Sequence, residues 1–278
     1  MQEKAPPLRL EREVGLAGAV ALIAGTMIGS GIFMSPQTVL VSAGSAGASL
    51  LVWGACGLLV ALISLCYAEL GTCVRASGGE YAYILRTCGP VPAFMLVLSS
   101  ALLVRPAGVA GIALSFAQYA LAPFYPECAP PTPLLKGVAA AAVLALATVN
   151  CMDVRVSMRV QVLFLVAKVA ALAVIVVGGL ALLATGRAHS FEGSFEGTNV
   201  GISPLGIAFY QGLWAYDGWN NLNYVTEELR RPEVNLPRAL LIAVSLVTGL
   251  YLMVNVSYLS AMTPREMLSS GAVAVTWG

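Results

Sequence analysis

Residues 16–40 read LAGAVALIAGTMIGSGIFMSPQTVL, and they lie in a stretch between Glu13 and Glu69 that contains no charged residue. A helix that crosses a bilayer needs roughly 20 predominantly apolar residues. The stretch is therefore long enough for two spanning helices, at 16–40 and 48–67, joined by the small polar turn SAGSAG at 42–47. This region predicts an all-α transmembrane protein.

The composition of the whole chain supports the same class. Of its 278 residues, 58% are hydrophobic and only 10% are charged, whereas a typical soluble domain carries about 25% charged residues. So few charges can furnish the loops of a membrane bundle but cannot coat a soluble globule. The net charge of +1 argues against nucleic acid as a partner. The six cysteines show no C-x-x-C spacing, so we expect no metal site and no cofactor.

Five further apolar segments follow, which brings the predicted number of spans to seven. Three of them contain a charged residue: Arg105, Lys168 and Asp217. Arg105 precedes Pro106, whose ring disrupts regular helix hydrogen bonding. Apart from Asp217, the spans hold no acid–base or metal cluster, which disfavours an enzyme. The five segments are residues 91–119, 137–150, 160–183, 201–223 and 239–261.

Basic residues are distributed unequally between the two sets of loops. One set holds ten and the other three, and cytoplasmic loops carry the excess of Lys and Arg. We therefore predict a cytoplasmic N-terminus, which disfavours a seven-span receptor of the G-protein-coupled type. The ten are Lys4, Arg9, Arg12, Arg75, Arg86, Arg155, Arg159, Arg230, Arg231 and Arg238, and the three are Lys136, Arg187 and Arg265.

Two of the predicted spans are interrupted near their middle. Residues 25–31 read GTMIGSG and residues 212–221 read GLWAYDGWNN. Glycine costs about 1 kcal/mol relative to alanine inside a helix, and an aspartate at mid-depth is costly unless it faces protein or water. Taken alone, the first interruption also fits close packing of helices through small residues. Two interruptions five spans apart, however, are typical of inverted-repeat transporters, in which paired broken helices form a midplane site.

The chemistry of such breaks favours one class of ligand. Unwinding frees backbone N–H groups at the start of each second half-helix, where the helix dipole also attracts an anion. It frees carbonyl groups at the end of each first half-helix, and these accept hydrogen bonds from an ammonium. A site with both features suits a zwitterion, namely an amino acid.

Several short motifs carry a family resemblance. They are GTMIGSGIF at 25–33, GGEY at 78–81, WAYDGWN at 214–220, and EEL at 227–229 leading to NLP at 235–237. Together they resemble the amino acid–polyamine–organocation superfamily, and in particular the light chains of heteromeric amino acid transporters. Within that group the pattern is most similar to the members that exchange cystine and dibasic amino acids.

The resemblance implies a LeuT-like inverted-repeat fold of twelve spans, of which this sequence provides about seven. It predicts a cytoplasmic tail at 1–15, a first repeat at 16–183, an extracellular loop at 184–200 and a partial second repeat at 201–278. It also implies sodium-independent exchange of neutral and cationic L-amino acids, and of cystine, across the plasma membrane. The partner it implies is a single-span glycoprotein heavy subunit. Because the expected fold is incomplete, the alternative is a transport-incompetent form that binds the heavy subunit in a regulatory or assembly role.

The resemblance also assigns the substrate-binding residues. They are Met27, Ile28, Ser30, Gly31, Trp214, Ala215, Asp217 and Asn220. Ser30 and Gly31 match the segment that binds the substrate carboxylate, although a packing role is the alternative. Met27 and Trp214 would offer backbone carbonyls to the substrate ammonium, and Trp214 matches an aromatic gate or packs as an ordinary tryptophan. Asn220 either braces the unwound segment or contacts the substrate.

Three further residues have roles that follow from the resemblance. Relatives that prefer large neutral substrates have glycine where Asp217 stands, so its carboxylate is expected to select cationic side chains, unless it caps the second half-helix. Lys168 is expected to place an ammonium where sodium-coupled relatives bind sodium, unless it snorkels to the cytoplasmic surface. Cys128 lies in an outer, proline-rich loop and is expected to form the disulfide with the heavy subunit, unless it is a free thiol.

Overall fold

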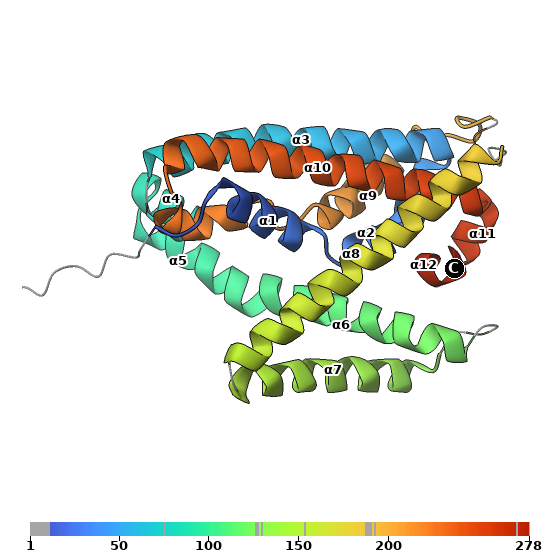
Figure 1. Cartoon of the computed structure of the whole chain (residues 1–278), viewed down its shortest axis with the longest axis horizontal. Helices are drawn as coiled ribbons and strands as arrows, with labels where there is room; N and C mark the ends of the chain where they lie inside the picture. Colours follow the sequence, from blue (N-terminus) through green and yellow to red (C-terminus); the bar gives the residue numbers. More distant parts are fainter. Residues whose placement is uncertain are drawn as a thin grey trace, which may run out of the picture.

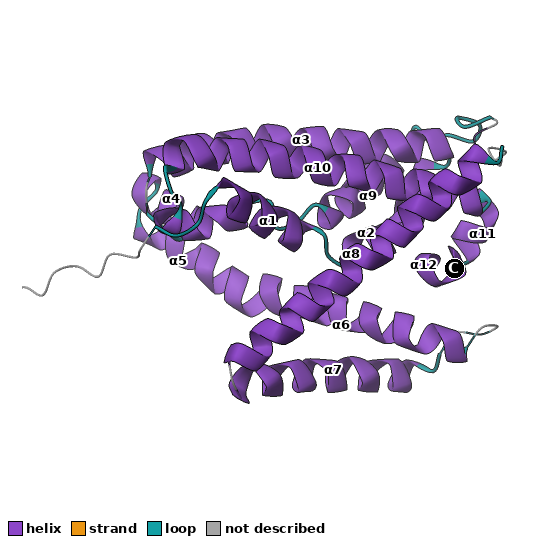
Figure 2. Cartoon of the chain, in the orientation of Figure 1, coloured by secondary structure: helices purple, strands orange, loops and turns teal. Residues whose placement is uncertain are grey.

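The structure is a computed structural model that describes residues 12–74, 76–125, 128, 130–152, 154–186, 191, 193–270 and 272–277. Within these residues the regular elements are helices, and no strand occurs (Figure 2). This confirms the prediction of an all-α protein. Residues 1–11 of the predicted cytoplasmic tail, and residues 187–190 and 192 of the predicted outer loop, lie outside the described residues.

The helices have the following bounds. They are α1 (Leu16–Met27), α2 (Gly31–Ala43), α3 (Ala46–Cys73), α4 (Glu80–Thr87), α5 (Pro90–Ser99), α6 (Arg105–Leu121), α7 (Thr132–Met152), α8 (Val154–Ala184), α9 (Ile202–Ala215), α10 (Pro232–Ala261), α11 (Pro264–Ser269) and α12 (Val273–Trp277). A π-helical turn, Ser100–Val104, joins α5 to α6. Short 3₁₀ helices cover Ala122–Phe124 and Asn221–Glu228.

The observed helices refine the bounds of the predicted spans. Among the described residues, five helical stretches are long and apolar enough to cross a membrane, and the bent pair α1–α2 makes a sixth. The segment predicted at 201–223 is broken within 212–221, as its sequence indicated: α9 has 14 residues and ends at Ala215, and a 3₁₀ helix follows from Asn221. The span predicted at 137–150 extends over Thr132–Met152, since the exposed Lys136 is tolerated near the end of a spanning helix.

The proline in the third predicted span has the expected effect on the backbone. The π-helical turn at Ser100–Val104 lies immediately before Arg105 and Pro106. A proline cannot donate the backbone hydrogen bond of a regular helix, and π-type turns are one way in which a helix accommodates such a defect. The helix continues through Leu121 after the defect.

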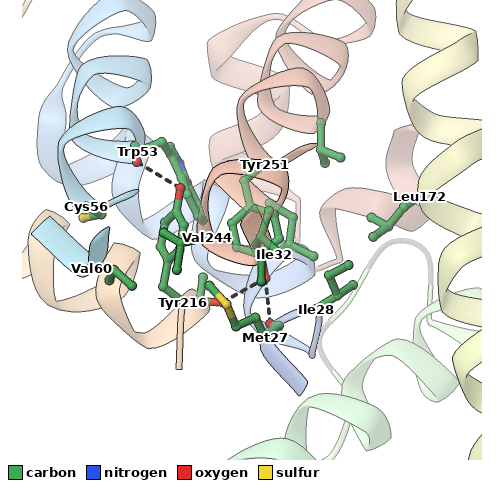
Figure 3. Packing of buried hydrophobic residues seen from close by; sticks show 14 of the residues in the cluster. Met27, Ile28, Ile32, Trp53, Cys56, Val60, Leu172, Tyr216, Val244 and Tyr251 are labelled. Carbon is green, nitrogen blue, oxygen red and sulfur yellow. Dashed lines mark hydrogen bonds between the residues drawn. The ribbon is translucent and has the colours of Figure 1, made fainter. Parts of the chain in front are cut away.

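The core lies where α3 and α10 run side by side over α1 and α9 (Figure 1). An aromatic cluster next to the helix breaks is formed by Trp53 of α3, by Tyr216, which follows α9, and by Tyr251 of α10. All three side chains are fully buried (Figure 3). The Tyr216 hydroxyl donates to the Trp53 carbonyl at 3.1 Å, and the Tyr216 and Tyr251 rings meet edge to face with centroids 5.0 Å apart. Such pairs add stability beyond the burial of their area, so the cluster anchors the chain on either side of the breaks.

The outer helices pack differently from this core. In the most apolar stretch of Pro90–Phe124 only 6% is buried inside the protein, and the same holds for Thr132–Cys151. In the most apolar stretch of α10 the buried share is 44%. In Figure 1, α4 and the α7–α8 junction lie at the left end of the molecule, while α11, α12 and the α6–α7 connection lie at the right end.

Candidate functional site

The first helix break separates α1 from α2. The two helices differ in direction by 53°, and the Gly29 N–H turns back to the Met27 carbonyl at 2.8 Å. The N–H groups of Ser30 and Gly31 have no acceptor among the described residues. They lie at the N-terminus of a 13-residue helix, so the break exposes donors at the positive end of a helix dipole.

The second break follows α9. The helix ends at Ala215, and the chain resumes as the 3₁₀ helix at Asn221. Gly218 lies between them with φ of +102°, a conformation that L side chains rarely adopt, and a Cβ there would lie 3.2 Å from the Thr26 backbone. The positive φ therefore favours glycine at this turn, and the Thr26 backbone leaves little room for a side chain.

The two breaks are in contact with each other. A Cβ added at Gly31 would lie 2.4 Å from the Ala215 Cα atom. The Thr26 hydroxyl lies 3.3 Å from the Gly218 carbonyl oxygen. The start of α2 and the end of α9 thus form one continuous surface.

A cavity of about 940 Å³ opens at this surface. Its walls come from both breaks, from α5 and α6, and from α8. Almost all of the predicted site residues line it: Met27, Ser30, Gly31, Lys168, Trp214, Ala215, Asp217 and Asn220. Ile28 does not line the cavity, because its side chain is only 7% exposed and packs in the hydrophobic core (Figure 3).

Tyr251 joins the carbonyl ends of the two breaks and was not foreseen from the sequence. Its hydroxyl lies 2.7 Å from the Met27 carbonyl oxygen and 2.9 Å from the Ala215 carbonyl oxygen. A single hydroxyl proton can point to only one of them at a time, so one carbonyl keeps acceptor capacity. The sequence offered no signal for this role, since Tyr251 lies inside an apolar helix where a buried aromatic residue is ordinary.

Lys168 reaches from α8 to the end of α1. Its ammonium donates to the Gly25 carbonyl at 2.6 Å. The side chain is half-buried and lines the cavity, so in this structure it turns to the helix break and does not snorkel to the membrane surface. The positive charge of the ammonium is favourable there, because the C-terminal end of α1 is the negative end of the helix dipole.

Asp217 and Trp214 are the exposed residues of the second break. The Asp217 N–H donates to the Trp214 carbonyl at 3.2 Å, but the Asp217 carboxylate accepts no hydrogen bond within the described part of the chain. The alternative in which it caps the second half-helix is therefore absent from this structure. The carboxylate is left exposed at the cavity wall.

Glu80, Arg105 and Tyr224 also line the cavity. Glu80 belongs to the GGEY motif, and Arg105 is a charge within an apolar span. Both features stand out in the sequence, but neither residue was predicted to belong to the site. The Arg105 guanidinium forms no hydrogen bond or ion pair among the described residues. Two acids and two bases therefore face one cavity.

Cys128 is separate from this site. It is exposed, lies in the connection between α6 and α7, and does not line the cavity. That connection is at the end of the molecule opposite α4 (Figure 1).

Several helices are long and apolar enough to cross a membrane, and two helix breaks meet at a polar cavity. These features define a multi-pass membrane protein of the transporter class. The sequence model of the amino acid permease family matches residues 14–277, and the chain belongs to that family. It is 49% identical over 269 residues to the b(0,+)-type amino acid transporter 1 of Mus musculus and of Homo sapiens. It is 44% identical over 275 residues to the large neutral amino acids transporter small subunit 2 of Mus musculus.

These matches cover 97% of this chain but only 55% and 51% of the relatives. The chain therefore spans about half the length of the curated relatives that it matches. The family and these relatives are transporters and not enzymes.

Proposed function

We propose that this chain takes part in sodium-independent exchange of L-amino acids across the plasma membrane, as the light subunit of a heterodimer. Its substrates are neutral and cationic amino acids, with cystine among them. The observation that carries the proposal is the cavity at which both helix breaks meet, since it gathers unused N–H donors, carbonyl acceptors and an exposed carboxylate.

The α-carboxylate of the substrate binds at the start of α2. The N–H groups of Ser30 and Gly31 have no other acceptor among the described residues, and charge-assisted hydrogen bonds to them are stronger than neutral ones. The α-ammonium binds at the ends of α1 and α9, where it shares the Met27 and Ala215 carbonyls with the Tyr251 hydroxyl. Trp214, beside them, covers the bound substrate.

The side chain of the substrate extends toward Asp217. A guanidinium or ammonium there gains the attraction of a carboxylate that no protein group occupies in the described chain. Lys168 holds the Gly25 carbonyl, in the place where a sodium ion would otherwise coordinate, which accounts for exchange without sodium.

The orientation and the partner follow from features outside the cavity. The excess of basic residues in one set of loops supports a cytoplasmic N-terminus. Cys128 then lies on the outer side, where an oxidising compartment permits a disulfide. A single-span glycoprotein heavy subunit supplies the other cysteine.

A second candidate function is a regulatory or assembly role without transport. It is favoured by the separation between Cys128 and the cavity, because the heavy subunit can then be bound whether or not the substrate site operates.

One experiment separates the two functions. The chain is purified with its heavy subunit and reconstituted in liposomes, and uptake of labelled leucine and arginine is measured with and without amino acid inside. Uptake that requires internal amino acid supports exchange. A complex that assembles and yet neither binds nor takes up amino acid supports the assembly role and contradicts the exchanger.

A further inference from the structure

The loop at residues 76–80 is hydrogen-bonded along the 3₁₀ helix that follows the second break. The Ser77 N–H donates to the Glu227 carboxylate at 3.0 Å, and the Glu227 N–H donates to the Ser77 hydroxyl at 3.3 Å. The Gly79 N–H donates to the Asn223 carbonyl at 3.2 Å. The second half of this broken span is thus held by a segment about 150 residues away in sequence.

Glu80 extends this contact into the cavity. Its carboxylate accepts hydrogen bonds from the Asn220 amide and from the Tyr224 hydroxyl, one at each oxygen. All three side chains are partly buried and line the cavity. Glu80 is also the first residue of α4, where the helix dipole stabilises its negative charge.

These contacts determine the orientation of the Asn220 side-chain amide, that is, whether its NH₂ group or its oxygen faces Glu80. An ionised carboxylate only accepts hydrogen bonds, so Asn220 must turn its NH₂ group toward Glu80. The described residues offer the Asn220 oxygen (Oδ1) no hydrogen bond. Asn220 therefore contributes an acceptor to the cavity, and the acceptor is unoccupied by protein.

We propose that Glu80 is a positioning residue for substrate selectivity: it fixes Asn220 as a hydrogen-bond acceptor toward the substrate side chain. Side chains that carry donors, such as a guanidinium or an ammonium, are favoured, and an aliphatic side chain is unaffected. This inference rests on the proposed function. It distinguishes Glu80 from Asp217, whose own carboxylate faces the cavity without a partner among the described residues.

The variant Glu80→Gln tests the proposal, because a glutamine amide both donates and accepts. Asn220 can then turn its oxygen to the glutamine NH₂ group and its own NH₂ group to the cavity, where it opposes a cationic side chain. We expect the affinity for arginine relative to leucine to fall about fivefold or more, which is about 1 kcal/mol. Leucine affinity should change less than twofold.

The measurement is displacement of labelled leucine by unlabelled arginine or leucine from the purified complex with the heavy subunit. Ser77→Ala is the matched control, since it weakens the contact of the same loop with Glu227 and leaves the Glu80–Asn220 pair in place; its arginine-to-leucine ratio should equal that of the wild type. If Ser77→Ala lowers the ratio as much as Glu80→Gln, loop attachment alone is responsible and the proposal is wrong.

A double-mutant cycle of Glu80 and Asn220 tests whether the two residues act on the arginine-to-leucine affinity ratio together, which a purely structural role of Glu80 would not produce. Asn220→Ala should lower the ratio by itself, and adding Glu80→Gln to it should have no further effect. A ratio that Asn220→Ala leaves unchanged overturns the proposal even if Glu80→Gln does not fold. So does an equal loss of arginine and leucine binding in Glu80→Gln. If the wild-type complex binds neither amino acid, the proposed function is wrong. If the wild-type complex binds both and the variants do not change the arginine-to-leucine ratio, only this inference is wrong.

Discussion

The two helix breaks differ in how the chain resumes after them. After the first, a regular helix of 13 residues begins at Gly31, and the N–H groups at its start have no acceptor in the described part of the chain. After the second, the chain resumes as a 3₁₀ helix that the loop at 76–80 holds in place. The first break therefore presents backbone groups, whereas the second presents the side chains of Asp217 and Asn220 in addition to the Ala215 carbonyl.

This difference separates two requirements of an amino acid site. Every α-amino acid has the same carboxylate and ammonium, which backbone donors and acceptors can recognise. Substrates differ only in their side chains, and side chains on the protein can change without altering the backbone. We therefore expect changes at the first break to affect all substrates, and changes to the side chains of Asp217 and Asn220 to affect them selectively.

The largest effect is expected at the contact between the breaks. In Gly31→Ala the new Cβ would lie 2.4 Å from the Ala215 Cα atom, so one helix must shift. Overpacking typically costs 1–3 kcal/mol, and about 2.7 kcal/mol is a hundredfold in affinity. Equilibrium binding to the purified complex should show leucine and arginine weakened alike, by up to about a hundredfold.

Gly54→Ala in α3 is the matched control, because a Cβ there meets nothing within 4 Å. It should bind both amino acids as the wild type does. A Gly31→Ala protein that folds and binds normally would show that the breaks need not touch.

The next effect distinguishes the second break from the first. Asp217→Asn keeps the size of the side chain and removes its charge. Arginine and lysine affinity should fall about tenfold, which is about 1.4 kcal/mol, and leucine affinity much less. Glu233→Gln removes a carboxylate outside the cavity and should change neither. Equal losses for both substrate classes, with surface expression maintained, would make Asp217 structural.

A smaller and uniform effect is expected from Lys168→Met, which removes the hydrogen bond to the Gly25 carbonyl and keeps an apolar stem. Hydrogen bonds to charged groups contribute about 1.5–3 kcal/mol, and partial exposure reduces this, so we expect about a fivefold loss. Leucine and arginine should be affected equally, in the presence or absence of sodium. Lys136→Met, at an exposed lysine outside the cavity, is the control, and a change confined to arginine would place Lys168 at the substrate side chain instead.

Much of this arrangement could be predicted from the sequence. The glycines at 25–31 and the aspartate at 217 are costly in a spanning helix, so their positions indicated both breaks. The sequence did not indicate that the second break would resume as a 3₁₀ helix, because that depends on hydrogen bonds from the loop at 76–80. It also did not indicate that Ile28 would turn into the core, since the direction of one side chain in an unwound turn is set by packing.

The partners of buried polar groups were the hardest to predict. Tyr251 and Glu80 act on residues 224 and 140 positions away in sequence. No local pattern encodes such pairs, because only the packing of α10 and α4 against the breaks brings them together. Glu80 carried the stronger signal, as a charged residue between a double glycine and a tyrosine.

Cys128 provides the smallest expected effect on substrate binding, because it lies outside both breaks and outside the cavity. Cys128→Ser should leave arginine and leucine affinities unchanged within about twofold. It should nevertheless abolish the larger species that the chain and the proposed heavy subunit form on non-reducing gels, since an exposed cysteine on the proposed outer side is available for an intermolecular disulfide. Cys88→Ser, at an exposed cysteine next to α4 at the opposite end, should retain that species. Persistence of the larger species in Cys128→Ser would assign the disulfide elsewhere, and its loss in Cys88→Ser alone would reverse the predicted orientation of the chain in the membrane.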